Sequence, residues 1–268
     1  MDNRCLLPVL LLLPLLVVGC GSEPEQAAAP QPPATTASQE AAPQEQKTAA
    51  QWGYTGDAGP QNWATLDEAY AACAGTQQSP VDLAADDEAQ DVAIQLDYAA
   101  AEGTLVDTGH GVQVNVEGGT MTIDGKTFAL KQFHFHTPSE HTLRGRSYAA
   151  EAHLVHAADD GELAVLGIVY EEGEASDVLA PVWEDLGNLG DADPRTINVA
   201  DMLPSDRVTY TYTGSLTTPP CSEGVRWHVM EEPLTMSAGQ LRALTAIHDG
   251  NNRPPQPLNE RELDRVAL

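Results

Sequence analysis

The sequence QFHFHTPSEH, residues 132–141, contains three of the chain's eight histidines. His134 and His136 alternate with phenylalanine, which is typical of a β-strand with one apolar face. Residues two apart in a strand project from the same face, about 6.5–7 Å apart, so the two imidazole rings can approach one point. The segment predicts a strand that carries two candidate metal ligands, although a lone buried histidine more often only forms a hydrogen bond in a core.

A second segment, EAHLVHA at residues 151–157, supplies a third candidate ligand. Its alternation places Glu151 and His153 on one face, and its distance along the chain from the first segment suits a neighbouring antiparallel strand. Three neutral imidazoles can hold a tetrahedral Zn²⁺ and leave one position open, which is typical of catalytic rather than structural zinc. The two segments therefore predict a Zn²⁺ site made by His134, His136 and a third imidazole from the second segment.

The remainder of the sequence indicates one mainly β domain with peripheral helices. Strand-like segments with period-2 alternation, several of them separated by Gly or Asp-Gly turns, recur along residues 51–268 without an internal repeat or a second linker. Helical patterns are confined to residues 175–189 and 237–247. We therefore expect a single folded domain at 51–268.

The composition of the chain is strongly acidic. Asp and Glu number 40 against 13 Lys and Arg, which gives a formal net charge of -27. Nucleic acid is excluded as a partner, since phosphate binding needs a basic surface. An acidic surface of this kind is typical of proteins that work in high salt, where screening weakens charge repulsion, and drift in composition explains it equally well.

The N-terminus is predicted to be a targeting segment. Residues 6–18 form an apolar run that is too short to span a bilayer. The sequence VVGC, which ends at Cys20, resembles a bacterial lipobox. We expect a lipoprotein signal peptide at 1–19 and a lipid on the Cys20 sulfur, with ordinary signal cleavage as the alternative.

A linker is expected between this segment and the domain. Residues 20–50 consist mainly of Ala, Pro, Gln, Glu, Ser and Thr, so they cannot bury enough apolar surface to fold. The predicted protein is held to a membrane only by its N-terminal lipid, on the periplasmic or cell-surface side. Gly21 after the lipidated cysteine favours the outer membrane.

Two cysteines remain for the folded domain. Cys5 leaves with the signal peptide and Cys20 is the lipidation candidate, which leaves Cys73 and Cys221. In an exported and oxidising compartment they pair most economically with each other. Two separate buried thiols are the alternative.

Eight segments, in order, together resemble the α-class carbonic anhydrases, particularly the bacterial periplasmic members. They are WGYTGDAGPQNW, QQSPVDL, GHGVQVNVE, QFHFHTPSEHT, AAEAHLVH, AVLGIVY, YTGSLTTPPCSEGVRWHV and NNRPPQPLN. The resemblance implies a central, twisted, mostly antiparallel sheet of about ten strands with a metal in a conical cleft. It also implies Zn²⁺-dependent hydration of CO2 to bicarbonate and a proton, and the bacterial relatives suggest a homodimer.

The resemblance also assigns roles around the metal. The three histidines named above match the zinc ligands, and Gln132 and Glu151 match the residues that orient these ligands by hydrogen bonds. Thr217 matches a threonine that accepts a hydrogen bond from the zinc-bound hydroxide and donates its own proton to Glu140. A carboxylate can only accept, so Glu140 would fix the direction of that hydrogen bond.

Further positions match the proton path and the substrate pocket. His110 matches the histidine that shuttles protons, although Asp107-Thr108 replaces the family's usual Asn-Asn before Gly-His. Without the resemblance, the apolar pocket positions would be read as ordinary core residues. The pocket positions are Val155, Val165, Leu216 and Trp227, with Thr218 as a residue that contacts substrate.

Other residues receive structural roles or none. Gln113 and Tyr54 match residues that line the solvent network, and Arg253 matches a residue that ties loops near the cleft. The remaining histidines are His141 and His156, which match buried hydrogen-bonded positions, and His228 and His248, which have no assigned role.

Three other interpretations stay open at this point. A carbonic anhydrase-like binding domain would have lost zinc-binding histidines, and all three are present. Another zinc hydrolase would commonly show His-Glu-x-x-His, which is absent. A purely structural β-protein would leave the combination of ligand and partner residues unexplained.

Overall fold

The structure is a computed structural model that describes residues 49–85, 88–91, 93–190 and 193–268. The predicted signal peptide at 1–19, the lipidation candidate Cys20 and nearly all of the predicted linker lie outside the described residues. Within the described ranges, no helix has the length and apolar character needed to cross a membrane.

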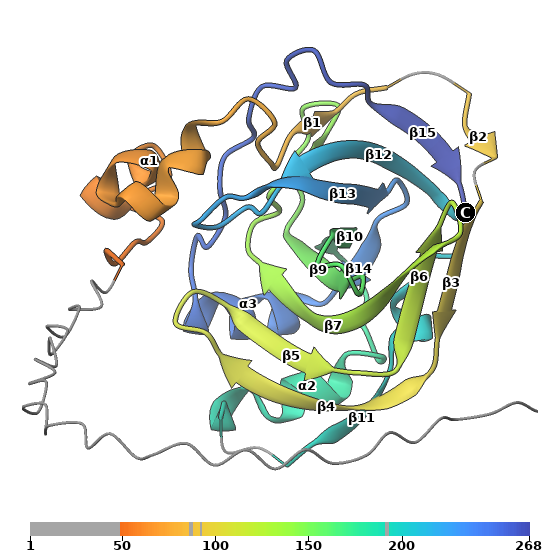
Figure 1. The fold of residues 1–268 in the computed structure, drawn as a ribbon. Helices are drawn as coiled ribbons and strands as arrows, with labels where there is room; N and C mark the ends of the chain where they lie inside the picture. The colour runs from red at the N-terminus through yellow and green to blue at the C-terminus, as the bar shows by residue number, and fades with distance from the viewer. Residues whose placement is uncertain (1–48, 86–87, 92, 191–192) are drawn as a thin grey trace, which may run out of the picture. The chain divides into compact units, whose positions relative to one another are not determined.

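Strands dominate the described residues (Figure 1). Three short α-helices and several 3-10 turns connect or flank them. The helices are α1 (Trp63–Leu66), α2 (Ala180–Glu184) and α3 (Ala238–Ile247), and the 3-10 turns are Gly56–Ala58, Glu68–Ala74, Leu186–Asn188 and Val199–Met202. The strands are β1 (Asp82–Leu83), β2 (Gln90–Asp91), β3 (Ile94–Tyr98), β4 (Ala100–Asp107), β5 (Val112–Val116), β6 (Gly119–Ile123), β7 (Lys126–His136), β8 (Thr142–Leu143), β9 (Ala150–Ala157), β10 (Leu163–Glu172), β11 (Arg195–Asn198), β12 (Val208–Ser215), β13 (Glu223–Met230), β14 (Leu234–Met236) and β15 (Asp264–Ala267).

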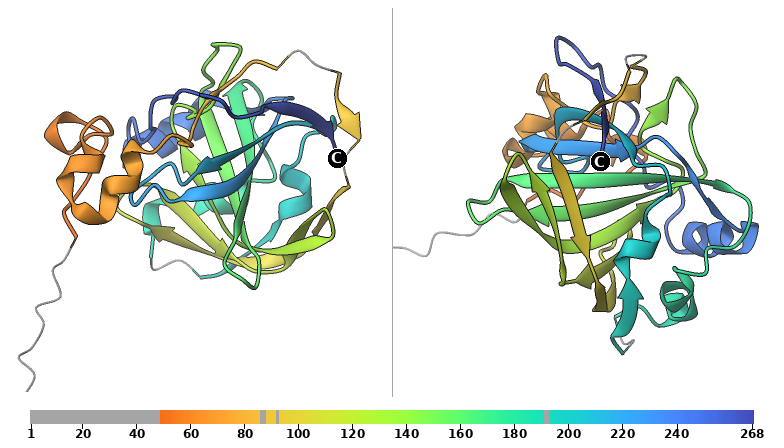
Figure 2. Two further views of the ribbon diagram at one scale, coloured as in Figure 1. Left: turned by 45° about the horizontal axis from the view of Figure 1, so that its top comes forward. Right: turned by 90° about the vertical axis from the view of Figure 1, so that its right-hand side faces the viewer.

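The main sheet is large and twisted (Figure 2). Its strands follow the order β11-β4-β5-β7-β9-β10-β13-β12-β15-β2, while β6 pairs with β7, β3 with β6, and β14 with β10. Most neighbours are antiparallel, and the pairs β10–β13, β10–β14 and β15–β2 are parallel. This arrangement confirms the predicted fold class, with β7 and β9 at the middle of the sheet.

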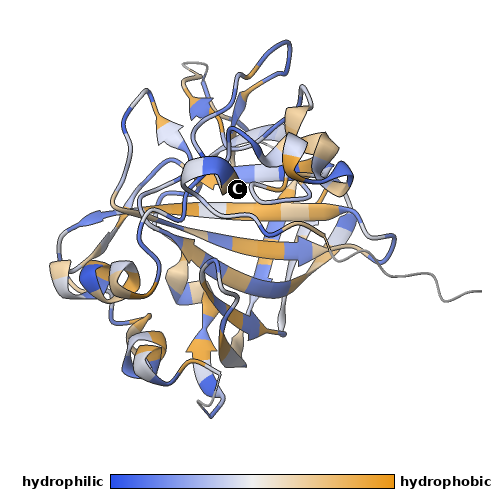
Figure 3. Ribbon diagram, turned by 90° about the vertical axis from the view of Figure 1, so that its left-hand side faces the viewer, coloured by the Kyte–Doolittle hydropathy of each residue, from blue (hydrophilic) through white to orange (hydrophobic). Residues whose placement is uncertain are grey.

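The two faces of the central strands bury different side chains. Phe133 and Leu154 point into a core that also contains residues of α2 and α3. The residues that alternate with them, such as His134 and His153, point to the opposite face. Figure 3 shows hydrophobic residues along the central strands, interspersed with hydrophilic ones.

Of the two predicted helices, the structure confirms α3 and shortens the other. The α3 helix begins with a capping box, in which Ser237 accepts from the Gln240 backbone and the Gln240 side chain accepts from the Ser237 backbone. The helix predicted over residues 175–189 is much shorter than expected. It starts one residue before Pro181, which is tolerated only in a first turn, and gives way to a 3-10 turn that contains Gly187.

The predicted disulfide is confirmed. Cys73 and Cys221 are bonded, with their Cα atoms 4.9 Å apart and a sequence separation of 148 positions. A cross-link that closes so long a loop stabilises a fold mainly by restricting the unfolded chain. It also fixes the segment that contains α1 to the loop that follows Thr217 and Thr218.

A candidate metal centre in an apolar cleft

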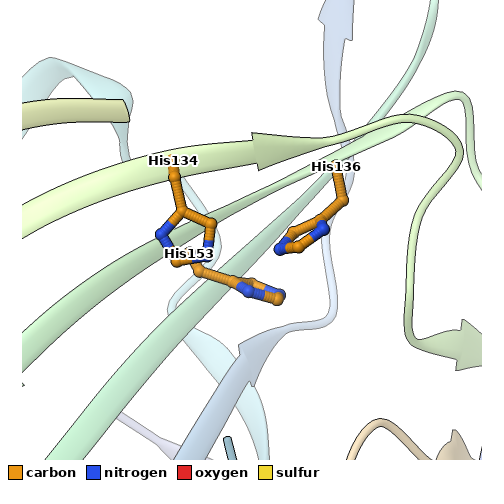
Figure 4. Close-up of side chains that lie close together, drawn as sticks. All are labelled: His134, His136 and His153. Atoms are coloured by element: carbon orange, nitrogen blue, oxygen red, sulfur yellow. The ribbon is translucent and has the colours of Figure 1, made fainter. Parts of the chain in front are cut away.

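Strands β7 and β9 bring the three predicted ligands together. His134 on β7 lies directly opposite His153 on β9, and His136 lies opposite Glu151. The centroids of the three imidazole rings lie 4.6–5.2 Å apart. Figure 4 shows the rings gathered on one side of the sheet, as the period-2 pattern predicts.

One nitrogen of each imidazole is hydrogen-bonded to an acceptor. His134 Nδ1 lies 2.8 Å from Gln132 Oε1, His136 Nδ1 lies 2.7 Å from the carbonyl oxygen of Asn251, and His153 Nε2 lies 2.9 Å from Glu151 Oε1. A carbonyl or carboxylate oxygen can only accept, so the paired nitrogen carries the proton. The other nitrogen of each ring is left with a free lone pair.

These free nitrogens converge. One ligand atom from each histidine lies within 4.8 Å of the other two. Nε2 of His136 is buried without a hydrogen-bond partner among the described residues, and it lies 3.5 Å from Glu140 Oε2, which is also 4.0 Å from His153 Nδ1. Buried imidazole nitrogens without partners are costly unless a cation occupies the space between them. The donor set therefore fits a divalent cation that takes nitrogen ligands.

Burial keeps the three imidazoles neutral. It holds the pKa of His134 well below its usual value, with the neighbouring imidazoles lowering it further, and it also lowers the pKa of His136 and His153. Only the neutral ring has a lone pair to donate to a metal. The site is therefore prepared for a cation over the ordinary pH range.

Glu151 supports the centre from behind. Its Oε1 accepts from His153 and His141, and its Oε2 accepts from the backbone N–H groups of Glu140 and His141. Although burial raises the pKa of this carboxyl, the two histidines outweigh burial and hold it well below its usual range. A Cβ at Gly167 on β10 would lie 3.1 Å from Glu151 Oε1, so a glycine there leaves room for the carboxylate.

Glu140 and Thr217 meet beside the metal centre. Glu140 Oε1 accepts from the backbone N–H of Arg253 at 2.7 Å, and the Thr217 side chain is in hydrogen-bonding contact with the same carboxyl. Burial raises the pKa of Glu140 to about 7, against the opposing effects of His153, Arg253 and Thr217. Arg253 is itself held by the carbonyl oxygens of Ser79 and Cys73.

An apolar cavity of about 250 Å³ adjoins the three rings. Every residue that the sequence analysis assigned to the substrate pocket lines it. These residues are Val155, Val165, Leu216, Thr218 and Trp227, with Thr217 between Leu216 and Thr218. His110, Gln113 and Tyr54 line the same cavity.

His110 lies in the turn between β4 and β5. Its ring stacks on Trp52, with centroids 3.7 Å apart and an interplanar angle of 14°. Tyr54 lies edge-on to the same imidazole, with centroids 6.5 Å apart. The predicted shuttle residue therefore lies at the cavity and is held against the first part of the described chain.

Two contributors were missed in the sequence analysis. The Asn251 carbonyl fixes His136, and the Asn251 side chain accepts from the Thr137 backbone N–H and donates to the carbonyl oxygens of His110 and Phe135. Trp52 supports His110 by stacking. Both residues stand in segments that carried the resemblance, but a backbone acceptor and a stacking partner have no signature in one sequence.

The remaining histidines lie away from the converging nitrogens. His141 is buried between Glu151 and the Tyr212 hydroxyl, and His156 is buried against Tyr98 and the carbonyl oxygen of Ala164. His228 is also buried, and its Nδ1 has no partner among the described residues. His248 pairs with Asp107 near the cleft.

The fold and the site define a mainly β protein with a three-histidine centre for a cation in an apolar cleft. Residues 58–266 match the family model for eukaryotic-type carbonic anhydrase. The chain therefore belongs to the eukaryotic-type carbonic anhydrase family.

Individual relatives agree with this assignment. A carbonic anhydrase of Pectobacterium atrosepticum is 42% identical over 216 residues, which cover 78% of this chain and 88% of the relative. A carbonic anhydrase of Klebsiella pneumoniae is 39% identical over 221 residues, with 80% and 90% covered. The α-carbonic anhydrase from Thermovibrio ammonificans, solved with the inhibitor sulfanilamide, has a TM-score of 0.76 at 40% identity and matches 81% of this chain and 100% of that chain.

Proposed function

We propose that this protein catalyses the reversible hydration of CO2 to bicarbonate and a proton with a Zn²⁺ ion held by His134, His136 and His153. One observation carries the proposal. Each imidazole gives one nitrogen to a protein acceptor, and the other nitrogens converge beside an apolar cavity. The family membership and the names of the relatives support the same activity.

The donor set suits Zn²⁺, since three neutral imidazoles are a known catalytic zinc environment with one open position. A bound Zn²⁺ would supply a hydroxide nucleophile near neutral pH by acidifying a coordinated water. Gln132, Glu151 and the Asn251 carbonyl would hold the rings in the orientation and tautomer that the metal needs.

Thr217 and Glu140 would orient the nucleophile. Glu140 is buried beside the three rings, and a cation there would favour its ionised form. An ionised Glu140 can only accept, so Thr217 must donate its proton to the carboxylate. The Thr217 oxygen is then left to accept a hydrogen bond from the attacking hydroxyl group, which directs the nucleophile's lone pair at the carbon of CO2.

The apolar part of the cavity would hold the substrate. CO2 has no charge and no hydrogen-bond donor, so a small hydrophobic wall is the binding site that its chemistry allows. Val155, Val165 and Leu216 supply such a wall next to the rings, and Trp227 closes it. Thr218 adds a hydroxyl that can bind bicarbonate, the more polar product.

His110 would pass the product proton to buffer. A His110→Ala variant is expected to lower kcat about tenfold or more at low buffer concentration, because His110 is the histidine among the described cavity-lining residues that is not a proposed metal ligand. Added imidazole should restore most of the loss. Stopped-flow hydration assays with and without imidazole measure both effects, and a wild-type kcat at low buffer would remove His110 from the proton path.

The activity itself is tested on the purified protein. Zinc per chain and CO2 hydration, followed by a pH indicator, are measured before and after removal of the metal by a chelator. We expect one zinc per chain, loss of hydration on removal and recovery on addition of zinc. A folded, zinc-loaded protein without hydration would instead support the binding-domain interpretation.

We also propose that the protein is an outer-membrane lipoprotein whose domain works on the periplasmic or cell-surface side, and that it forms a homodimer. The signal-like sequence at 1–19 and the lipobox-like end at Cys20 support the anchoring, and the linker-like composition of 20–50 supports a tether. The mass of the mature N-terminal peptide tests the lipid, and sedimentation tests the dimer.

A further inference from the structure

The turn that carries His110 is fastened to the end of α3. His248 is the residue at which α3 ends, and its Nε2 lies 2.7 Å from Asp107 Oδ1 at the end of β4. The same carboxylate oxygen accepts from the backbone N–H of Gly109 at 2.7 Å. One carboxylate therefore joins α3 to the turn that presents His110.

The fastening is anchored on the metal-binding strand. Thr137, which follows the ligand His136, donates its side-chain hydroxyl to the His248 carbonyl oxygen at 3.2 Å. Asn251, three residues after His248, donates to the His110 carbonyl oxygen at 3.1 Å. The positions of His248 and Asp107 relative to His110 are thus set by several bonds rather than by a single surface contact.

We propose that Asp107 and His248 form a hydrogen-bonded dyad that positions the His110 turn and tunes proton transfer through His110. This role rests on the proposed function, in which His110 carries the product proton. Neither residue lines the cavity, so both are positioning residues that act through His110 rather than catalytic residues.

The charges of the dyad act on His110 in opposite directions. Partial burial lowers the pKa of the His110 imidazole, a charge on His248 lowers it further, and the Asp107 carboxylate raises it. Although burial opposes it, hydrogen bonds from Gly109 and His248 lower the pKa of Asp107, so this carboxyl is ionised at neutral pH.

Few other titratable groups face this region. Tyr54 lies edge-on to His110, burial raises the pKa of its phenol, and the three metal-site imidazoles share the cavity. Asp249 follows His248 in the chain. The dyad therefore supplies opposing charges that act on His110 from outside the cavity.

Both side chains of the dyad are partly exposed to solvent. The His248 side chain is 18% exposed and the Asp107 side chain 42% exposed, so water screens both in part. A shift of either sign changes the protonated fraction of a shuttle histidine, whose efficiency depends on a pKa near the working pH.

The test uses two substitutions that keep the hydrogen bond and remove one charge each. His248→Gln retains an N–H donor and Asp107→Asn retains an oxygen acceptor. In the full-length zinc-loaded protein, NMR titration of the His110 imidazole is expected to show a higher pKa in His248→Gln and a lower pKa in Asp107→Asn than in the wild type. The midpoint of the pH profile of kcat at low buffer should move in the same directions.

A matched control removes a carboxylate elsewhere on the same strand pair. Glu117 is exposed at the far end of β5, about 16 Å along the strand from the His110 turn, which is beyond the screening distance in ordinary buffer. Glu117→Gln should leave the titration of His110 unchanged.

The possible outcomes distinguish a failure of the dyad proposal from a failure of the proposed function. If both variants leave the pKa of His110 unmoved, or move it in the same direction, the dyad as a charge-tuning device is overturned. If the pKa values move as expected while His110→Ala keeps full kcat at low buffer, the role in proton transfer is overturned with the shuttle itself. Opposite shifts in both the titration and the kcat profile support the inference.

Discussion

Replacing His134 with alanine is expected to abolish zinc binding at micromolar zinc and to lower kcat/KM for CO2 hydration about a thousandfold or more. Two imidazoles cannot hold the cation with the geometry that three supply, and the nucleophile depends on the metal. His134 suits the test because its hydrogen-bond partner Gln132 is a neutral, partly exposed side chain that can turn to water. Zinc per chain and stopped-flow hydration measure the two effects.

His156→Gln is the matched control for this variant. His156 lies on the same strand as His153 but faces the opposite side of the sheet, where it bonds to Tyr98. The His156→Gln variant should keep one zinc per chain and a CO2 hydration rate within a few-fold of the wild-type rate. A His134→Ala variant that still binds zinc and hydrates CO2 at the wild-type rate would show that the metal lies elsewhere.

Replacing Thr217 with alanine is expected to lower kcat/KM about a hundredfold while zinc stays bound. The Thr217 hydroxyl contacts the Glu140 carboxyl and can both donate and accept, and a lost orienting hydrogen bond in an active site commonly costs about two to three orders of magnitude. The measurement is kcat/KM alongside zinc per chain.

Thr217→Ser separates the hydroxyl from the rest of the side chain. Serine keeps the donor and acceptor, so it should recover most of the activity that alanine loses. If the Thr217→Ala and Thr217→Ser variants hydrate CO2 equally well, Thr217 does not orient the nucleophile, and its contact with Glu140 is only structural.

The ligand set could be predicted from the sequence because local periodicity and the resemblance agree. Residues two apart on a strand lie on one face, so periodicity assigned His134 and His136 together, and the resemblance assigned His153 on the neighbouring strand. The same reasoning identified the long central strands and the capped α3. These features depend on nearby residues.

Features that depend on distant residues escaped the sequence analysis. Strands such as β2 and β14 are two or three residues long and exist only because a longer strand offers them a partner. The Asn251 carbonyl reaches His136 across 115 positions of the chain, and any residue type has a carbonyl. Similarly, a helical pattern over 175–189 could not show that tertiary contacts keep only one turn and a half of it.

The pairing of His248 with Asp107 illustrates the same limit. The sequence analysis noted that Asp107-Thr108 replaces the family's usual Asn-Asn, and it left His248 without a role. Each observation was incomplete because the two partners lie 141 positions apart in the sequence. Only the fold shows that Asp107 supplies the acceptor and His248 supplies the donor of one hydrogen bond.

The stacking of Trp52 on His110 affects how shortened forms of the protein should be designed. Trp52 is the fourth described residue, and Ala50, two residues before it, is held by Tyr70 and Asp67. A start site chosen only to remove the predicted signal peptide and linker could also remove Trp52. His110 would then lose the ring on which it stacks. Shortened enzymes should therefore begin before residue 49, and bulky fusion partners belong at the other end of the chain.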